Sequence, residues 1–379
     1  MSTLERAVTS EVAEKLGRIR RELAAQDLAG VLLATQPNVS WILAGRDHWV
    51  SRTLERSFAW VHVSAERFQV LALDNERARL LEELGVEGLG AELVTAPWWS
   101  SLDELAASVS GERLVNDGYG PGERRPDVAQ RLRLVLTEAE RARIIELGDD
   151  TCAAVEEALL ELDASTMAAL SERNVAARVA TGFEARGVVA AGIMVGGAAR
   201  RQRFRHPVVT DAPIGRDLLV VVVGVRGGLH VALSRTVSAG RAVSELAERH
   251  ELACAVEAAM IATSRPGRTW TDALEAGMRR YADGGLPDEW RAHTQGGPIG
   301  YGPREYVAYP REGATAVVQP DVLQHQAYAW NPTVLGAKSE DTFLVDADGW
   351  TAVSNSDRWP ALHIETPHGA VARPAILEL

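Results

Sequence analysis

The pattern of apolar and polar positions changes in character about a third of the way along the chain. Apolar residues at helical spacing predict a helix from Glu5 to Gln26, and a continuous apolar run from Ala29 to Ala34 predicts a buried strand. Strand-like and helix-like stretches then alternate, which indicates a small α/β domain. The strand-like stretches are 41–44, 58–63, 68–73 and 91–95, and the helical ones are 75–84 and 102–109.

The second part of the chain begins with a helix-start signature. Thr137 and Glu140 have the spacing of a capping box, and they predict a helix to about residue 162, followed by another over 165–186. Strands then dominate, and their grouping favours α+β, a curved antiparallel sheet covered by helices. The strands are expected at 188–195, 218–225, 228–237, 314–318, 326–330, 342–345 and 351–354, and the helices at 244–264 and 271–282.

These patterns predict two domains, a small N-terminal α/β domain of residues 1–134 and a second domain of residues 135–379. The length agrees, because one hydrophobic core rarely serves 379 residues. The charged N-terminus lacks the apolar core of a secretion signal, and no apolar run could span a bilayer, so we expect a cytoplasmic protein with no membrane partner. The net charge of −12 opposes nucleic-acid binding, which needs a basic surface.

Three patches of the second domain contain most of the residues that could carry chemistry. The first runs from Arg200 to Pro207 and includes Arg203 and His206. It leads to a strand that contains Ser234 and Arg235. Four arginines around one histidine would form a positive pocket if they converged, but a solvated basic loop is the simpler interpretation.

The second patch, residues 293–305, is rich in glycine and proline, yet it also contains His293, Gln295 and Tyr301. Glycine permits close approach of the backbone to a ligand, although most such segments are only loops. The third patch begins at Trp330 and Asn331 and continues to Glu340 and its neighbours, where polar residues interrupt a strand-like pattern. A surface turn would explain this third pattern equally well.

In order and spacing, the patches resemble the catalytic domain of the creatinase/aminopeptidase P family. That family has a histidine before a glycine turn, a strand pair closing on Thr-Arg-Thr, a glycine-rich loop that begins with histidine, and a strand with Arg-x-Glu-Asp. The matching segments here are His206 with Gly215, 234–236, 293–305 and 338–341. The resemblance implies a pita-bread fold for the second domain, a small-molecule substrate, and a homodimer in which each N-terminal domain helps to close the partner's site.

The resemblance also implies where metal-dependent members hold two divalent ions, with two aspartates, one histidine and two glutamates. By register, those positions are Val221, Ala232, Gly297, Asn331 and Glu340 here. Three of these residues have no side-chain donor, and one carboxylate will not hold two ions. We therefore predict no metal ion and no cofactor, as in the metal-free creatinase-like branch of the family.

The resemblance places His206 at the centre of catalysis, because it is the obvious group there that can exchange a proton near neutral pH. Glu340 is expected to orient His206, and Ser234 and Asn331 to donate hydrogen bonds to a developing oxyanion. A structural ion pair between Glu340 and Arg235 is the simpler alternative. The residues expected to contact the substrate are Arg203, Arg235, His293, Gln295, Tyr301, Trp330 and Asn331.

The predicted function is metal-independent hydrolysis of a C–N bond in a small amide, amidine or amino-acid-derived compound, without peptidase activity. One alternative is a non-hydrolytic acid–base reaction of a biosynthetic pathway, such as elimination, dehydration or cyclisation. The other is a non-catalytic pita-bread module that binds a peptide or a protein. Polar residues in all three patches favour an enzyme, because a pure binding module could replace them with apolar residues.

Overall fold

The computed structural model describes residues 3–311 and 320–379. The chain forms two compact units, one of Met1–Glu140 with Gly227–Leu229 and the other of Arg141–Arg226 with His230–Leu379. The strand expected at 314–318 lies outside the described residues. Within the described part of the chain, no helix combines the length and the apolar composition needed to cross a membrane.

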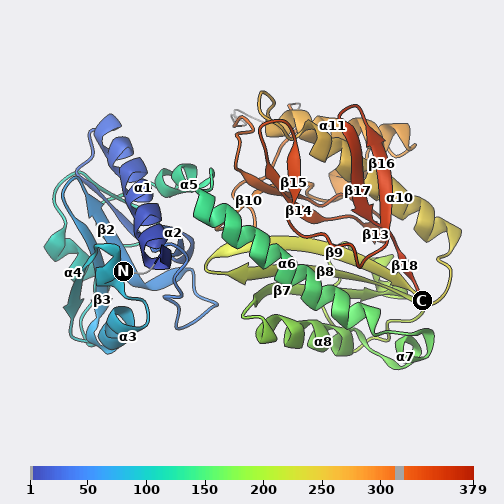
Figure 1. Ribbon diagram of the computed structural model, residues 1–379, viewed down its shortest axis with the longest axis horizontal. Helices are drawn as coiled ribbons and strands as arrows, with labels where there is room; N and C mark the ends of the chain where they lie inside the picture. The colour runs from blue at the N-terminus through green and yellow to red at the C-terminus, as the bar shows by residue number, and fades with distance from the viewer. Residues whose placement is uncertain (1–2, 312–319) are drawn as a thin grey trace. The chain divides into compact units, whose positions relative to one another are not determined.

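The first unit is built on a six-stranded mixed sheet with the order β4-β3-β2-β1-β5-β6 (Figure 1). β1 pairs antiparallel with β2 and parallel with β5, and it is buried along its whole length, so both faces of the sheet are covered there. The strands are β1 (Gly30–Thr35), β2 (Arg56–Ser64), β3 (Phe68–Leu73), β4 (Glu92–Ala96), β5 (Leu114–Asn116) and β6 (Glu123–Arg124), and the α-helices are α1 (Thr3–Ala25), α2 (Gln36–Ile42), α3 (Arg77–Glu82), α4 (Leu102–Val109) and α5 (Asp127–Arg133).

One expected strand of this unit is a helix. The run at 41–44 belongs to the end of α2 and the turn after it, and Pro37 stands in the first turn of that helix. Proline suits this position because its fixed φ is already helical and its missing N–H has no partner to lose. Trp41 is fully buried, which accounts for the apolar run without a strand.

The second unit contains two four-stranded sheets and two short hairpins. The sheet orders are β18-β9-β8-β7 and β10-β11-β14-β15, and a hydrogen bond of 2.8 Å from the Ser234 amide to the Glu340 carbonyl joins the two sheets. The strands are β7 (Val189–Gly197), β8 (Asp217–Arg226), β9 (Leu229–Ser238), β10 (Gly296–Ile299), β11 (Ala327–Trp330), β12 (Thr333–Val334), β13 (Ala337–Lys338), β14 (Asp341–Val345), β15 (Trp350–Ala352), β16 (Ala361–Thr366), β17 (Gly369–Pro374) and β18 (Leu377–Glu378).

Helices cover the outer sides of these sheets (Figure 1). Trp270 of α11 packs with Tyr328 and Trp330 of β11 in one buried cluster, which fixes α10 and α11 against the second sheet. Figure 1 shows α6 and α8 beside β7–β9. The α-helices are α6 (Glu138–Leu160), α7 (Ala164–Ala169), α8 (Glu172–Ala185), α9 (Ala198–Arg201), α10 (Ser244–Thr263) and α11 (Trp270–Asp283). The predicted α+β class is confirmed.

Local sequence also explains a helix boundary that periodicity missed. The helix expected over 165–186 is divided into α7 and α8, because Ser171 begins a new helix. Its hydroxyl accepts a hydrogen bond from the Asn174 backbone N–H, and the Asn174 side chain accepts one from the Ser171 backbone N–H in return. Such a capping box satisfies N–H groups that would otherwise have no partner at a helix start.

Candidate functional site

The alternation of side chains along two strands divides the third patch between two environments. The Ser339 hydroxyl donates to Glu257 of α10, and the Asp341 carboxylate accepts from Arg373, which itself pairs with Glu257, so both side chains face the helices. Because neighbouring side chains of an extended segment point to opposite sides, Lys338 and Glu340 face away from α10. We call this side, turned away from α6 and α10, the inner face of the second unit.

Ser234 belongs to the same inner face. Its neighbour in β9, Arg235, contacts Glu156 of α6 at 3.0 Å, so the Ser234 side chain points the opposite way. Asn331 directly follows β11. In the antiparallel pairing of β11 with β14, Trp330 lies opposite Asp341, and the next positions along are Asn331 and Glu340. That register places it beside Glu340. The structure therefore brings together three residues that the sequence separates widely.

A histidine pair forms the centre of the candidate site. His206 follows α9, and His293 follows a short 3-10 helix (Glu289–Ala292). Their Nε2 atoms are 2.9 Å apart, so one ring must donate its N–H and the other must accept it. His206 is exposed, whereas His293 is only 9% exposed, and the Nδ1 atom of His293 has no hydrogen-bond partner among the described residues. The pair thus joins an accessible ring to a buried one.

Burial and nearby cations keep both rings neutral at physiological pH. Burial lowers the pKa of His293 to about 2, and the positive charges of Lys338 and Arg205 act in the same direction. Partial burial and Lys338 also lower the pKa of His206, against the opposing effect of the Glu340 carboxylate. A neutral imidazole can accept a proton, which is the form that general-base chemistry requires.

Glu340 is the carboxylate of the inner face, and two cations share it. Arg304 donates to one carboxylate oxygen at 3.0 Å, and the Lys338 ammonium lies 3.3 Å from the other. Glu340 and Lys338 are 3% and 2% exposed. Sequence reasoning missed Lys338 and Arg304. The position of Lys338, two residues before Glu340 in an extended segment, was the available signal for a shared face.

Ser234 and Asn331 bring polar atoms that have no partner among the described residues. The Ser234 hydroxyl and the Asn331 carbonyl oxygen are both buried without a hydrogen bond. Buried polar groups are nearly always hydrogen-bonded, so such atoms on one face are expected to meet a ligand or water. The Ser234 hydroxyl could donate to an oxyanion, whereas the unpartnered Asn331 atom is an acceptor, and the oxyanion-facing role expected for both residues stays a prediction.

Arg235 does not belong to the inner face, which corrects the substrate contact predicted for it. Its guanidinium is fully buried, and its N–H groups donate to Glu156, to Asp341 at 3.0 Å, to the Ser234 and Ser354 carbonyls and to the Cys152 sulfur. No N–H remains for a ligand carboxylate. The alternative ion pair between Arg235 and Glu340 is also wrong, because Asp341 is the partner of Arg235 in this third patch.

Three other predicted contact residues are engaged elsewhere. The Trp330 indole faces the helices and donates to Ser264 at the end of α10, so it supports the core and not a ligand. The Gln295 side chain is saturated by Tyr281 and by two backbone carbonyls. Arg203 is exposed, and its guanidinium lies over the ring of Phe204. Tyr301, which is fully buried just after β10, stays a predicted contact.

The residues of the inner face do not fit a pair of divalent ions. Val221 and Ala232 are buried and apolar, and no group of three metal-ligating side chains occurs in the described part of the chain. Gly297 has a φ of +144°, and a Cβ there would lie 2.9 Å from the Tyr306 carbonyl oxygen. A histidine at that position would be strained. The donor set that the family uses for metal is therefore missing from the face that would hold it.

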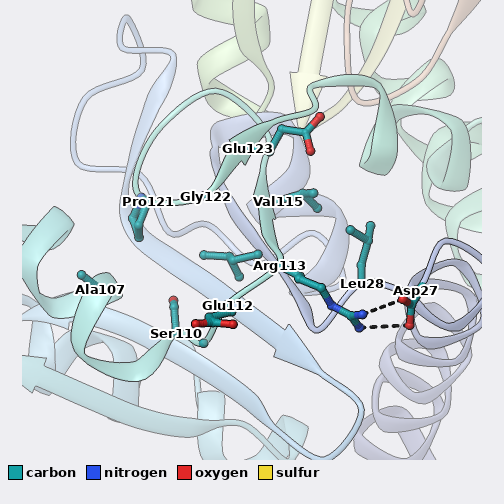
Figure 2. A pocket seen from close by; sticks show the side chains of 12 residues that line it. Asp27, Leu28, Ala107, Ser110, Glu112, Arg113, Val115, Pro121, Gly122 and Glu123 are labelled. Atoms are coloured by element: carbon teal, nitrogen blue, oxygen red, sulfur yellow. Dashed lines mark hydrogen bonds and ion pairs between the residues drawn. The ribbon is translucent and has the colours of Figure 1, made fainter.

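A surface pocket of about 540 Å³ lies in the first unit, and it contains none of the predicted site residues (Figure 2). An ion pair between Arg113 and Asp27, with N–O distances of 2.5 and 3.0 Å, borders it. Both side chains are more than half exposed. Exposed ion pairs contribute little energy, so this pair gives no reason to assign a function to the pocket.

Comparisons with known proteins decide the family. The profile of metallopeptidase family M24 matches residues 146–347, more than half of the chain. This chain belongs to metallopeptidase family M24. The probable dipeptidase PepE of Mycobacterium tuberculosis is 27% identical over 234 residues, which cover 60% of each chain.

Two further comparisons extend over nearly the whole chain. The Xaa-Pro dipeptidase of Pyrococcus horikoshii is 22% identical over 374 residues, which cover 91% of this chain and 98% of that one. The crystal structure of dipeptidase PepE from Mycobacterium ulcerans superimposes with a TM-score of 0.71 at 20% identity, covering 98% of this chain and 99% of that one. The pita-bread fold with an N-terminal domain, predicted from the sequence, is confirmed.

The same comparisons contradict the predicted function. A metal-independent enzyme of small amides without peptidase activity was expected, with a non-hydrolytic reaction or a non-catalytic binding module as alternatives. The matching family is one of metallopeptidases, and the curated relatives are dipeptidases. The comparisons show the M24 family and not a metal-free branch within it.

Proposed function

We propose that this M24 chain hydrolyses dipeptides or other short peptides at the inner face of its second unit. The observation that carries the proposal is the His206–His293 pair beside Glu340, on the scaffold of a family whose relatives are dipeptidases. The curated PepE relative is matched over 60% of its length, so its substrate class enters here as support for a proposal.

His206 is the residue that exchanges a proton with the reacting groups. It is the accessible ring of the pair, so water or a peptide amide can reach it. When His206 takes up a proton, its Nε2–H donates to the neutral Nε2 of His293 at 2.9 Å, and the negative charge of Glu340 favours the charged ring. His293 thus positions the ring of His206 and accepts from it, without needing to titrate itself.

Ser234 and Asn331 surround the position where the peptide carbonyl would bind. Ser234 supplies a hydroxyl donor, and the Asn331 amide supplies an N–H₂ group beside an acceptor oxygen that bonds to none of the described residues. Donors aimed at the oxygen of a tetrahedral intermediate stabilise the transition state more than the ground state. Because the donor set does not fit a metal pair, no step is assigned to metal ions.

The test is hydrolysis of a dipeptide panel, including alanyl-proline, by the purified chain with and without added Mn²⁺. We expect His206→Ala to lower kcat/KM by about 100-fold or more, as general-base loss usually does, at an unchanged melting temperature. The control is His368→Ala, because His368 is an exposed histidine in the turn between β16 and β17. If the wild-type chain hydrolyses no member under either condition, the proposal is overturned.

A further inference from the structure

Glu257 of α10 contacts the residues on both sides of Glu340. One of its carboxylate oxygens accepts a hydrogen bond from the Asp341 backbone N–H at 3.1 Å, and the other accepts one from the Ser339 hydroxyl. Both contacts come from the helix side of the extended segment, opposite to the Glu340 side chain. The chain is therefore held immediately before and immediately after the residue whose carboxylate belongs to the inner face.

A third contact fixes Glu340 itself. Its backbone carbonyl accepts a hydrogen bond from the Ser234 N–H at 2.8 Å, which joins the segment to β9. Because the positions before, at and after Glu340 are all bonded, the direction of its side chain from the backbone is fixed. The carboxylate at the end of that side chain is then paired with Arg304 and Lys338.

The buried charge of Glu257 contributes geometry more than stability. Its side chain is completely buried, and Arg373 compensates the charge at an N–O distance of 2.7 Å. The cost of desolvating such a pair offsets much of its attraction, so apolar residues of similar size often stabilise a fold equally well. A buried carboxylate, however, can hold a hydroxyl and a backbone N–H at defined positions, which an apolar side chain cannot do.

The position of the Glu340 carboxylate affects the proton affinity of His206. Its negative charge raises the pKa of His206, against the lowering effects of burial and of Lys338. This Coulomb interaction weakens as the distance between the two charges increases. Displacement of the carboxylate would therefore lower the pKa of His206 and make the ring a weaker proton acceptor.

We infer that Glu257 is a positioning residue, which holds the Glu340 carboxylate beside His206. It acts from the helix side, through its two contacts with Ser339 and Asp341. The inference rests on the proposed function in taking His206 as the residue that exchanges a proton with the substrate.

The experiment measures the pKa of His206 directly, by NMR titration of protein with isotope-labelled histidine, so it needs no substrate. His206→Ala assigns the resonance, and Glu340→Gln gives the pKa without the carboxylate charge. The test variants are Ser339→Ala, which removes one contact of Glu257, and Glu257→Asp, which withdraws the carboxylate but keeps its charge. We expect both to lower the pKa of His206 by part of the decrease seen in Glu340→Gln.

A matched control separates positioning from loss of stability. Ser264→Ala removes another completely buried hydroxyl at the end of α10, one that accepts a hydrogen bond from the Trp330 indole. Both serine variants should have lower melting temperatures, because each loses a buried hydrogen bond. Only Ser339→Ala should lower the pKa of His206, and its kcat/KM for a dipeptide that the wild type hydrolyses should fall about 10-fold.

The outcomes distinguish this inference from the proposed function. A decrease in the pKa of His206 in either test variant, absent from Ser264→Ala, would support the positioning role even in a chain that hydrolyses no dipeptide, and that chain would overturn the function alone. An unchanged pKa in both test variants, an equal decrease in Ser264→Ala, or an unchanged pKa in Glu340→Gln would overturn the positioning role and leave the function standing wherever hydrolysis is observed.

Discussion

His206 and His293 share one hydrogen bond, yet their surroundings give them different properties. His206 is exposed and can exchange a proton with a ligand, whereas His293 is buried beside Lys338 and Arg205. The sequence marked both residues as candidates, but it could not show that their Nε2 atoms meet at 2.9 Å. The two residues are 87 positions apart in the sequence, so no local pattern could reveal this contact.

The buried ring predicts a dependence of stability on pH. The pKa of His293 is about 2 in the fold and about 6.5 in the unfolded chain, so the unfolded state binds more protons between these values. The contribution is fully present above pH 6.5 and is lost as pH falls. We expect His293 alone to reduce the free energy of unfolding by about 2 kcal/mol between pH 6.5 and 5.

Urea unfolding of His293→Gln at a series of pH values checks this prediction. The variant should lose less stability than the wild type on acidification, although His48 and His250, whose pKa values are also lowered by burial, retain their own dependence. His368→Gln, at an exposed histidine, is the control and should follow the wild-type slope. Identical slopes for His293→Gln and the wild type would contradict the assigned pKa.

At the scale of elements, the alternation of side chains in the extended segment Lys338–Asp341 separates residues that contact the helices from residues of the inner face. Ser339 and Asp341 are held by Glu257 and Arg373 on the helix side. That network fixes the backbone, and the alternation of side chains then directs Lys338 and Glu340 to the inner face. The β9 strand repeats this arrangement, with Arg235 held by α6 and Ser234 on the inner face.

In the strand β10, we predict that steric contact opposes a metal-ligating side chain at position 297. Gly297 has a positive φ, and a Cβ would approach the Tyr306 carbonyl oxygen to 2.9 Å. We expect Gly297→Ala to lower the free energy of unfolding by about 1–3 kcal/mol, because both strain and contact oppose the side chain. Gly192→Ala in β7 is the control, since its Cβ would meet no atom within 4 Å.

Chemical denaturation of the two glycine variants measures whether the side chain at position 297 lowers the free energy of unfolding. The control should remain within about 1 kcal/mol of the wild type, because alanine there is unstrained and restricts the unfolded chain. Equal stability of Gly297→Ala and Gly192→Ala would show that β10 can accept a side chain. In that case the missing histidine ligand at 297 would have no steric cause.

At the scale of the whole molecule, the resemblance to the family predicts a homodimer, and this stays a prediction. The first unit exposes Trp98 and Trp99, 66% and 73% of whose surfaces are accessible. Adjacent exposed aromatic residues are costly for an isolated chain and are typical of surfaces that bind a partner. Light scattering should give twice the 40.9 kDa mass of one chain, and a single-chain mass at all micromolar concentrations would contradict the prediction.

The sequence by itself determined the α+β class, most helices and strands, and the family, because each depends on local periodicity or on ordered motifs. It also marked His206, His293, Ser234, Asn331 and Glu340 as candidates, and their functional roles stay predictions. In the structure, the two histidines are in contact, and Glu340 is paired with Arg304. The residues that it misassigned were Arg235, Trp330 and Gln295, whose polar groups are satisfied by partners far away in the sequence.

Only the tertiary structure decided which polar groups remain available to a ligand. Arg235 and Lys338 are both buried cations next to acidic residues, and their local sequences do not distinguish them. In the fold, Arg235 is satisfied by Glu156, Asp341 and a carbonyl, whereas Lys338 shares Glu340 with Arg304. The physical reason is that hydrogen-bond saturation depends on all neighbours at once, and most of those neighbours come from distant segments.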